Sequence, residues 1–340
     1  MLPLLFVSLS LPLLTSAKTP KSPLLQTDFP DPCIIHHPTN NTYYAFATSS
    51  NQKNIQAASA PSASGPWTWL SSVDPLPDPG PWTSGPRNYG MTWAPSVISL
   101  PDSSGWVMYY SAQLPANSSA FHCVGAAVSK MSILGPYEPL PSPLACPLSK
   151  GGAIDPSGFF DPQTGKRYLV YKVDGNSLGN GGSCGNTIAP LRNTPIMLQR
   201  VNETDGVTLI GEPVEILDRD ERDGPLVEAP DLWWDGKRHV LFYSNHCWSE
   251  EGYSVNYAVS TDGVEGEYVK MNGTNGGERA LVMTEGIGDG FNLSAPGGAT
   301  SFWDEEKGES GIVLHANCRE GRCLFGVGIG VDEDGRVYVD

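Results

Sequence analysis

The sequence is poor in basic residues and has no stretch that would form a long helix. Lys and Arg number 21 against 37 Asp and Glu, and the formal net charge is −16. Nucleic acids and anionic membrane surfaces need a basic face on their partner, so this balance argues against both. Apolar residues show no sustained helical period, and 38 Gly and 30 Pro are spread through the chain. Such a composition breaks helices and predicts one all-β body.

Beyond its first residues the sequence also lacks any apolar run of the roughly 18 residues that a membrane span needs. Residues 1–17, MLPLLFVSLSLPLLTSA, form a short apolar run that ends in small residues, as a secretory signal peptide does. We therefore expect a signal peptide over 1–17 and a single domain over 18–340, secreted to the extracellular space as a monomer. Asn-x-Ser/Thr sequons, which are typical of secreted glycoproteins, occur at Asn40, Asn117, Asn202, Asn272 and Asn292.

The seven cysteines contain no C-x-x-C pair, and their scatter does not resemble a zinc site. In an oxidising compartment disulfides are expected instead. Plausible pairs are Cys123–Cys146, Cys184–Cys247 and Cys318–Cys323, which leave Cys33 free. Spacing alone does not fix this connectivity.

One type of segment, an apolar and aromatic strand that ends in a small or polar residue, occurs five times. The copies are TYYAFATS (42–49), GWVMYYSA (105–112), KRYLVYKV (166–173), KRHVLFYSN (237–245) and SGIVLHAN (310–317). Aligned on Thr48, Ser111, Lys172, Ser244 and Ala316, they lie roughly 60–70 residues apart. Three of them are followed by a segment in which a Ser precedes a Gly by a fixed interval and an aromatic residue comes next, at 57–67, 126–137 and 257–268.

A segment that contains a proline precedes each aromatic strand. These segments are DFPDPCII (28–35), TWAPSVIS (92–99), AIDPSGFF (153–160), VEAPDLWW (227–234) and SAPGGATSFW (294–303). Each repeat thus has the elements of four short antiparallel strands, which is the plan of a propeller blade. We predict a five-bladed β-propeller with four-stranded antiparallel blades. The alternative is a β-sandwich whose strands resemble one another by composition, which the fixed internal spacings disfavour.

Acidic residues occur in three of the proline segments. In a propeller the first strand of each blade lines the central channel, so equivalent positions converge on one axis. Asp31, Asp155 and Glu228 should therefore be neighbours. Like charges raise one another's pKa, and proteins tolerate such clusters mainly for metal binding or acid–base chemistry. Asp before Pro is also a common turn starter, so the joint pattern, and no single acid, carries this prediction.

The motifs, taken together and in order over residues 24–340, resemble those of glycoside hydrolase family 43. The resemblance rests on DFPDPCII with YYAFATS, TWAPSV, AIDPSGFF with GKRYLVY, and VEAPDLWW with LFYS. It implies a five-bladed propeller active on arabinose- and xylose-containing plant cell-wall polysaccharides. Residue by residue, it implies that Asp31 is the general base, that Glu228 is the general acid, and that Asp155 orients the acid and keeps its pKa high while itself staying ionised.

The implied chemistry is an inverting hydrolysis. Asp31 would take a proton from water on one face of the sugar, and Glu228 would protonate the departing oxygen on the other. The two carboxyls should then lie roughly 6.5–9.5 Å apart, to leave room for the water. The resemblance favours an α-L-arabinofuranosidase or arabinanase, with a β-xylosidase as the alternative.

Further candidates lie near the expected site. Trp93 stands at the rim of the second blade, where it would stack on a sugar or belong to the core. Arg322 would reach a sugar hydroxyl from the fifth blade or lie on the surface. Many family members carry a His after Pro-Gly in the fifth blade, where this sequence has Gly298, so His315 is the remaining histidine candidate near the axis. No cofactor is expected to be required, and a structural calcium ion remains open.

Two other interpretations compete with the inverting hydrolase. A retaining propeller hydrolase of the invertase type would carry an Asn-Asp-Pro-Asn-Gly motif and a Glu-Cys pair, whereas this chain has FPDPC and places Ala229 after the glutamate. A propeller that binds sugars without cleaving them, or that is purely structural, also fits the repeat. The three acids argue against it without excluding it.

Overall fold

The computed structural model describes residues 22–85, 88–101, 104–115, 120–271, 282 and 293–339. The expected signal peptide and the sequons at Asn117, Asn272 and Asn292 lie outside these residues. Within them, no helix is long and apolar enough to cross a membrane.

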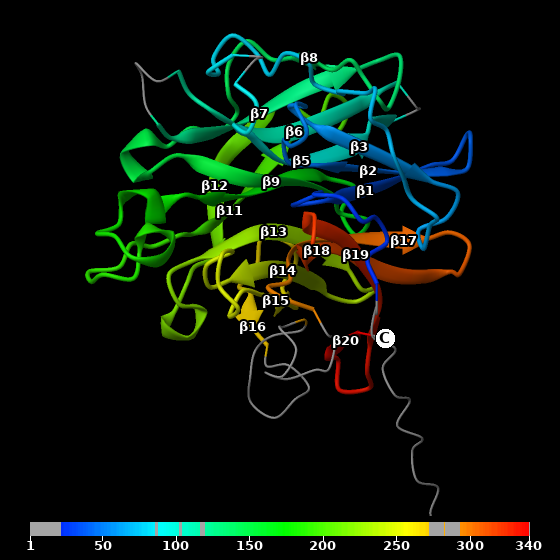
Figure 1. Cartoon of the computed structure of the whole chain (residues 1–340). Helices are drawn as coiled ribbons and strands as arrows, with labels where there is room; N and C mark the ends of the chain where they lie inside the picture. Colours follow the sequence, from blue (N-terminus) through cyan, green and yellow to red (C-terminus); the bar gives the residue numbers. More distant parts are fainter. Residues whose placement is uncertain are drawn as a thin grey trace, which may run out of the picture.

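Five antiparallel sheets of four strands each follow one another along the chain (Figure 1). The predicted five-bladed β-propeller is confirmed, and the sandwich alternative is wrong. Blade one contains β1 (Cys33–His37), β2 (Thr42–Ala47), β3 (Gln56–Ala60) and β4 (Thr68–Trp69). Blade two contains β5 (Thr92–Ser99), β6 (Trp106–Gln113), β7 (His122–Ser129) and β8 (Glu138–Pro139).

The remaining blades have the same strand order. Blade three contains β9 (Ala153–Phe160), β10 (Arg167–Val173), β11 (Ile196–Val201) and β12 (Leu209–Leu217). Blade four contains β13 (Val227–Trp234), β14 (His239–Asn245), β15 (Ser254–Ser260) and β16 (Val269–Lys270). Blade five contains β17 (Gly297–Asp304), β18 (Glu309–Cys318), β19 (Gly321–Val331) and β20 (Val337–Val339). Short 3₁₀ helices lie in the connections: η2 (Leu148–Lys150), η3 (Gly175–Leu178), η4 (Ser183–Gly185) and η5 (Glu221–Asp223).

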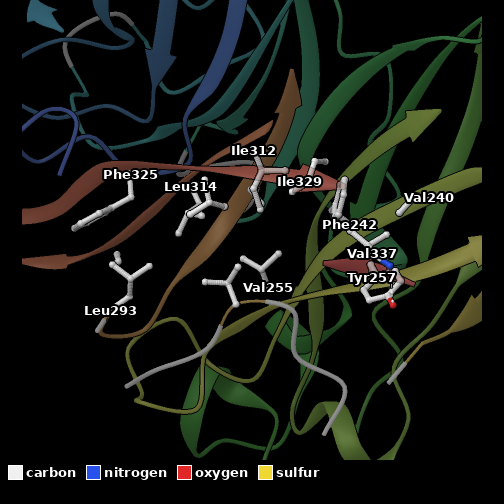
Figure 2. Packing of buried hydrophobic residues seen from close by; sticks show 14 of the residues in the cluster. Val240, Phe242, Val255, Tyr257, Leu293, Ile312, Leu314, Phe325, Ile329 and Val337 are labelled. Carbon is white, nitrogen blue, oxygen red and sulfur yellow. Dashed lines mark hydrogen bonds between the residues drawn. The ribbon is translucent and has the colours of Figure 1, made fainter. Parts of the chain in front are cut away.

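The apolar strands bury both faces because each blade is covered by a neighbour on either side. Five hydrophobic clusters result, and each combines residues of two adjacent blades. Between blades four and five, Val240, Phe242 and Tyr257 pack with Ile312, Leu314 and Phe325 (Figure 2). Burying a large apolar side chain contributes about 1.5–3 kcal/mol to stability, so packing at every seam stabilises the ring.

The segment before β1 closes the ring. The backbone N–H groups of Leu24 and Leu25 donate to the carbonyl of Leu324 in β19, and the N–H of Phe29 donates to the carbonyl of Arg322. Figure 1 shows the blue strands of blade one beside the orange and red strands of blade five. The first residues of the described chain therefore join the last blade to the first.

Three disulfides connect loops and strand ends: Cys123–Cys146, Cys184–Cys247 and Cys318–Cys323. Cys33 is free and buried, and burial raises the pKa of its thiol to about 12. All three predicted pairs, and the unpaired Cys33, are confirmed.

Candidate active site

The proline segments bring one residue of each blade to the central axis in the same backbone conformation. Asp31, Ala94, Asp155 and Ala229 each precede a proline and have φ between 44° and 54°, and Gly298 occupies the fifth position with φ 61°. A non-glycine residue in this left-handed region costs about 1–2 kcal/mol. Four of the five first strands carry a register shift here, so the strained residue belongs to a β-bulge. Bulges of this kind redirect side chains at functional sites.

Each of these strained residues donates its N–H to a side chain of the preceding blade. In three seams the acceptor is a hydroxyl on the aromatic strand: Thr48 for Ala94 at 2.8 Å, Ser111 for Asp155 at 2.9 Å, and Ser244 for Gly298 at 3.0 Å. His315 Nδ1 accepts from Asp31 at 3.1 Å. At the remaining seam the equivalent residue is Lys172, which cannot accept, and Asp155 Oδ2 accepts from Ala229 at 3.0 Å instead. These five bonds are called the seam ring below.

The seam ring corrects two details of the sequence alignment. The blade-five equivalent of Thr48 is His315, which pairs with Gly297, and not Ala316. Similarly, the blade-four equivalent of Asp31 and Asp155 is Ala229, so Glu228 lies one residue earlier in its strand. This offset is also visible in the sequence, because Asp31, Asp155 and Ala229 each directly precede a proline, whereas Glu228 lies two residues before Pro230.

The three predicted acids do come together. Asp31, Asp155 and Glu228 all line a cavity of about 410 Å³ at one end of the central channel. The remaining lining residues that matter below are Trp93, Lys172, Asp174, Trp248, Tyr253 and Arg322. A cavity of this size is typical of small-ligand sites.

Asp31 is surrounded by groups that favour its charged form. Thr48 Oγ1 donates to Asp31 Oδ2 at 2.6 Å, and Arg322 Nη1 lies 3.7 Å from Oδ1. Burial alone would raise the pKa of Asp31, but the Arg322 guanidinium, with the Thr48 hydroxyl, outweighs it and holds that pKa well below its usual value. Asp31 is therefore a carboxylate at any ordinary pH, as a proton acceptor must be.

Glu228 lies in a different setting. Its Oε1 accepts a hydrogen bond from the hydroxyl of Tyr253 at 2.9 Å, and Lys172 Nζ lies 3.0 Å from its Oε2. Lys172 is fully buried and also contacts Asp174 Oδ1 at 3.0 Å. Burial would lower the pKa of Lys172, but Asp174, Glu228 and Asp155 raise it above its ordinary value. A permanent cation thus stands beside Glu228, placed to stabilise the charge that this side chain acquires when it releases a proton.

Asp155 is coupled to Glu228 through the backbone and through charge. One of its oxygens accepts from the N–H of Ala229, the residue that follows Glu228. Burial, and then the Glu228 carboxylate, raises the pKa of Asp155 well above its ordinary value. Two buried carboxyls that interact in this way bind protons as a pair. The raised pKa runs counter to the expectation that Asp155 stays ionised, and the ionisation state of Asp155 stays a prediction.

Tyr253 and His315 connect the two sides of the cavity. Tyr253 donates to Glu228, and its ring stacks on that of His315 with centroids 5.9 Å apart. Because the Asp31 N–H points at Nδ1, the neutral His315 ring carries its proton on Nε2. Burial lowers the pKa of His315 and keeps the ring neutral. One chain of contacts, through Tyr253 and His315, therefore connects Glu228 to Asp31.

Both predicted substrate-binding residues line the cavity. Trp93 stacks on His122 with centroids 3.6 Å apart, and its indole N–H donates to the carbonyl of Gly90. The Arg322 guanidinium lies 5.1 Å from the ring centroid of Trp248, whose side chain is half exposed. Trp93 and Arg322 thus both face the cavity, and their contact with a sugar stays a prediction.

Sequence reasoning missed four residues of the cavity: Lys172, Asp174, Trp248 and Tyr253. A lysine inside the apolar strand KRYLVYKV was a usable signal, because a buried lysine needs a carboxylate partner. Trp248 and Tyr253 lie in the loop between β14 and β15, which has no pattern in common with the other blades. The Cys184–Cys247 disulfide attaches this loop to blade three.

No group of three metal-ligating side chains is found around His315 within the residues that the structure describes. Nε2 of His315 is buried without a hydrogen-bond partner among the described residues. Calcium, however, takes six to eight oxygen ligands, and Asp31 is the carboxylate in contact with this ring. In the described part of the chain, the three-donor group found is Cys318, Glu320 and Cys323, whose cysteines are joined in a disulfide.

Comparison with solved structures supports the fold. A thermostable family-43 glycoside hydrolase aligns with a TM-score of 0.73 at 22% identity, covering 93% of this chain and 95% of that one. An endo-1,4-beta-xylanase from Bacteroides thetaiotaomicron gives 0.66 at 19% identity, covering 96% and 97%. An alpha-L-arabinanase from Cellvibrio cellulosa, complexed with arabinohexaose, gives 0.65 at 20% identity, covering 93% and 96%. Comparison with curated proteins gave no match.

A family model extends the match to sequence. The model of glycosyl hydrolases family 43 matches residues 20–331, a span that includes all three acids, the seam ring and the cavity. The chain belongs to glycosyl hydrolase family 43 and is a glycosidase.

Proposed function

We propose that this protein is an inverting hydrolase of arabinose- or xylose-containing plant polysaccharides, with Asp31 as general base and Glu228 as general acid. Asp155 is the residue that orients Glu228, through the N–H of Ala229, and modulates its proton transfer. Trp93 and Arg322 contact the sugar. The observation that carries the proposal is that Asp31 and Glu228 line one cavity in different settings, Asp31 beside Arg322 and Thr48 and Glu228 beside Lys172 and Tyr253.

The reaction follows from that contrast. Asp31 removes a proton from water as the water oxygen bonds to the anomeric carbon. The bond from that carbon to the glycosidic oxygen breaks, and Glu228 gives its proton to the departing oxygen. Lys172 and Tyr253 then stabilise the Glu228 carboxylate until it is protonated again. The separation of the two carboxyls stays a prediction at roughly 6.5–9.5 Å. No step requires a metal or cofactor.

The substrate class rests on the similar structures. Solved relatives include an alpha-L-arabinanase complexed with arabinohexaose and an endo-1,4-beta-xylanase. We favour an α-L-arabinofuranosidase or arabinanase, with a β-xylosidase as the second candidate and a sugar-binding propeller without turnover as the third. An uncharged substrate suits an acidic protein.

The leaving group of the substrate separates the two proposed roles. Asp31→Asn and Glu228→Gln should each lower kcat/KM on arabinan, arabinoxylan or xylan about 100-fold or more. On an aryl glycoside whose phenol leaves without protonation, Glu228→Gln should recover most of the bond-breaking rate, whereas Asp31→Asn should not. Proton NMR of the first product should show the inverted anomer. Retention of configuration, or full activity of either variant on polysaccharide, would reject the assignment.

We also propose that the protein is secreted after removal of residues 1–17 and is glycosylated. The three disulfides support an oxidising compartment, and Asn40 is exposed at the turn between β1 and β2. The N-terminal sequence and the mass of the protein recovered from a secreting host, before and after deglycosylation, test both statements.

A further inference from the structure

A second hollow lies at the opposite end of blades three, four and five. It is an open groove of about 520 Å³, lined by the last residues of β9, β13 and β17 and the turns that follow. Strand β13 runs from Glu228 in the catalytic cavity to Trp234 in this groove. At about 3.3 Å per residue, the two sites are roughly 20 Å apart along one strand.

The groove carries aromatic rings that the fold does not require. Counted from the strained residue of the seam ring, the same strand position holds Phe160, Trp234 and Trp303 in blades three to five, but His36 and Ser99 in blades one and two. Phe160 is 50% exposed and Trp303 is 52% exposed. Because polar residues occupy this position in the same architecture, the exposed rings serve something other than folding.

The rings are also supported from within the protein. The Arg167 guanidinium lies 5.3 Å from the centroid of Phe160, and the His239 ring lies 4.7 Å from that of Trp234. The preceding residues in the same strands, Phe159 and Trp233, pack into or against the seam clusters. In blade three one ring is buried and its neighbour Phe160 is exposed, whereas in blade four Trp234 also packs against a seam cluster and is partly exposed in the groove.

The charge of the groove is close to zero. Its acidic lining residue, Asp235, is bound by the Arg238 guanidinium at 2.7 Å and is almost fully buried. Neither a polyanion nor a strongly basic segment is complementary to such a surface. Rigid aromatic rings in an uncharged groove, with Phe160 and Trp303 half exposed, suit the flat apolar faces of sugar rings, which also present hydroxyls for hydrogen bonding.

We propose that this groove, with Trp303 and Trp234 as its stacking platform, is a non-catalytic binding site for a neutral polysaccharide chain. The identity of that polysaccharide rests on the proposed function, and the binding itself does not. A chain bound at the groove remains close to the catalytic cavity, so the site raises the local concentration of polymer without adding a catalytic group.

Binding is tested in the Glu228→Gln background with soluble arabinan and arabinoxylan. Trp303→Ser and Trp234→Ser introduce the residue that blade two carries at the same position, so the fold should be kept. Each should weaken binding of the polymers about tenfold in affinity electrophoresis, and Trp303→Tyr should retain most of it. The control is Met131→Ser, which removes an exposed apolar side chain of blade two, away from the groove. This variant should bind the polymers as its parent does.

Calorimetric titration with an arabinan or xylan oligosaccharide should find two sites in the parent and one in Trp303→Ser. With Glu228 restored, Trp303→Ser should hydrolyse an aryl glycoside at the parental rate. Polymer binding unchanged by both serine variants would overturn the proposal. So would a dimer that Trp303→Ser converts to a monomer, because the groove would then be covered by a second copy. If the parent protein releases no sugar, the proposed function is refuted. Loss of polymer binding in the serine variants would still assign polysaccharide binding to the groove.

Discussion

At the scale of single residues, the acids were predictable and their partners were not. Asp31, Asp155 and Glu228 recur in equivalent segments, and repetition converges on an axis. Lys172 and Tyr253 contact Glu228, but Lys172 stands where two other blades carry Ser, and Tyr253 lies in a loop outside the repeat. Their roles depend on which side chains meet across a seam, and that is a property of packing. The low pKa of Asp31 likewise depends on Arg322, which lies almost three hundred residues away in the sequence.

Arg322 gives a testable pH dependence. Its guanidinium favours the carboxylate form of Asp31, so Arg322→Met should raise the pKa of Asp31. A general base works only when deprotonated, and the acidic limb of the profile of kcat/KM against pH should therefore move to higher pH. The exposed Arg319 offers a control, since Arg319→Met should leave the limb in place. A higher KM with an unmoved limb would mean that Arg322 binds substrate without tuning Asp31.

At the scale of elements, the proline and aromatic segments correctly predicted the first two strands of every blade. Their alignment failed by one residue at Glu228 and at His315. At Glu228 the offset was readable from the proline that follows Ala229, whereas at His315 it is seen only in the pairing of β17 with β18. The seam ring could not be predicted from the repeat, because each of its hydrogen bonds joins residues of two neighbouring blades.

The seam ring should contribute to stability one bond at a time. Ser244→Ala removes the acceptor of the buried Gly298 N–H, and an unpaired buried donor costs about 1–3 kcal/mol. Denaturant titration should show a loss of that size. Ser244→Thr keeps a hydroxyl, as Thr48 does in blade one, and should lose less. Equal losses in both variants would indicate that volume, and not the hydrogen bond, determines the effect.

At the scale of the whole molecule, the repeat predicted the architecture because five equal units with polar turns have few other ways to protect their sheet edges. The closure of the ring was not predicted. Residues 24–27 carry no propeller pattern, yet Leu24 and Leu25 bond to Leu324 and pack against the cluster between blades one and five. Closure depends on where the two ends of the chain meet, and a repeat describes only what lies between them.

Removal of the closing segment should weaken the whole ring. A protein that begins at Asp28 lacks the backbone bonds to Leu324 and the two leucines. We expect its free energy of unfolding to fall by about 3 kcal/mol or more, seen as a lower Tm in calorimetry. A protein that begins at Ser22 keeps these contacts and provides the control. Identical Tm values for the two would show that the ring closes through blades one and five alone.

The seam ring also shows where symmetry was given up. Blades one, two and four present a hydroxyl to the next blade, whereas blade three presents Lys172 and blade five presents His315. The two exceptions stand beside Glu228 and Asp31. Five identical blades would place the same hydroxyl at every seam and would bring no lysine or histidine to the acids. In this propeller the catalytic acids lie at the seams where the shared hydroxyl is replaced by another side chain. Seams that depart from the repeat therefore indicate where the active site of a propeller should be sought.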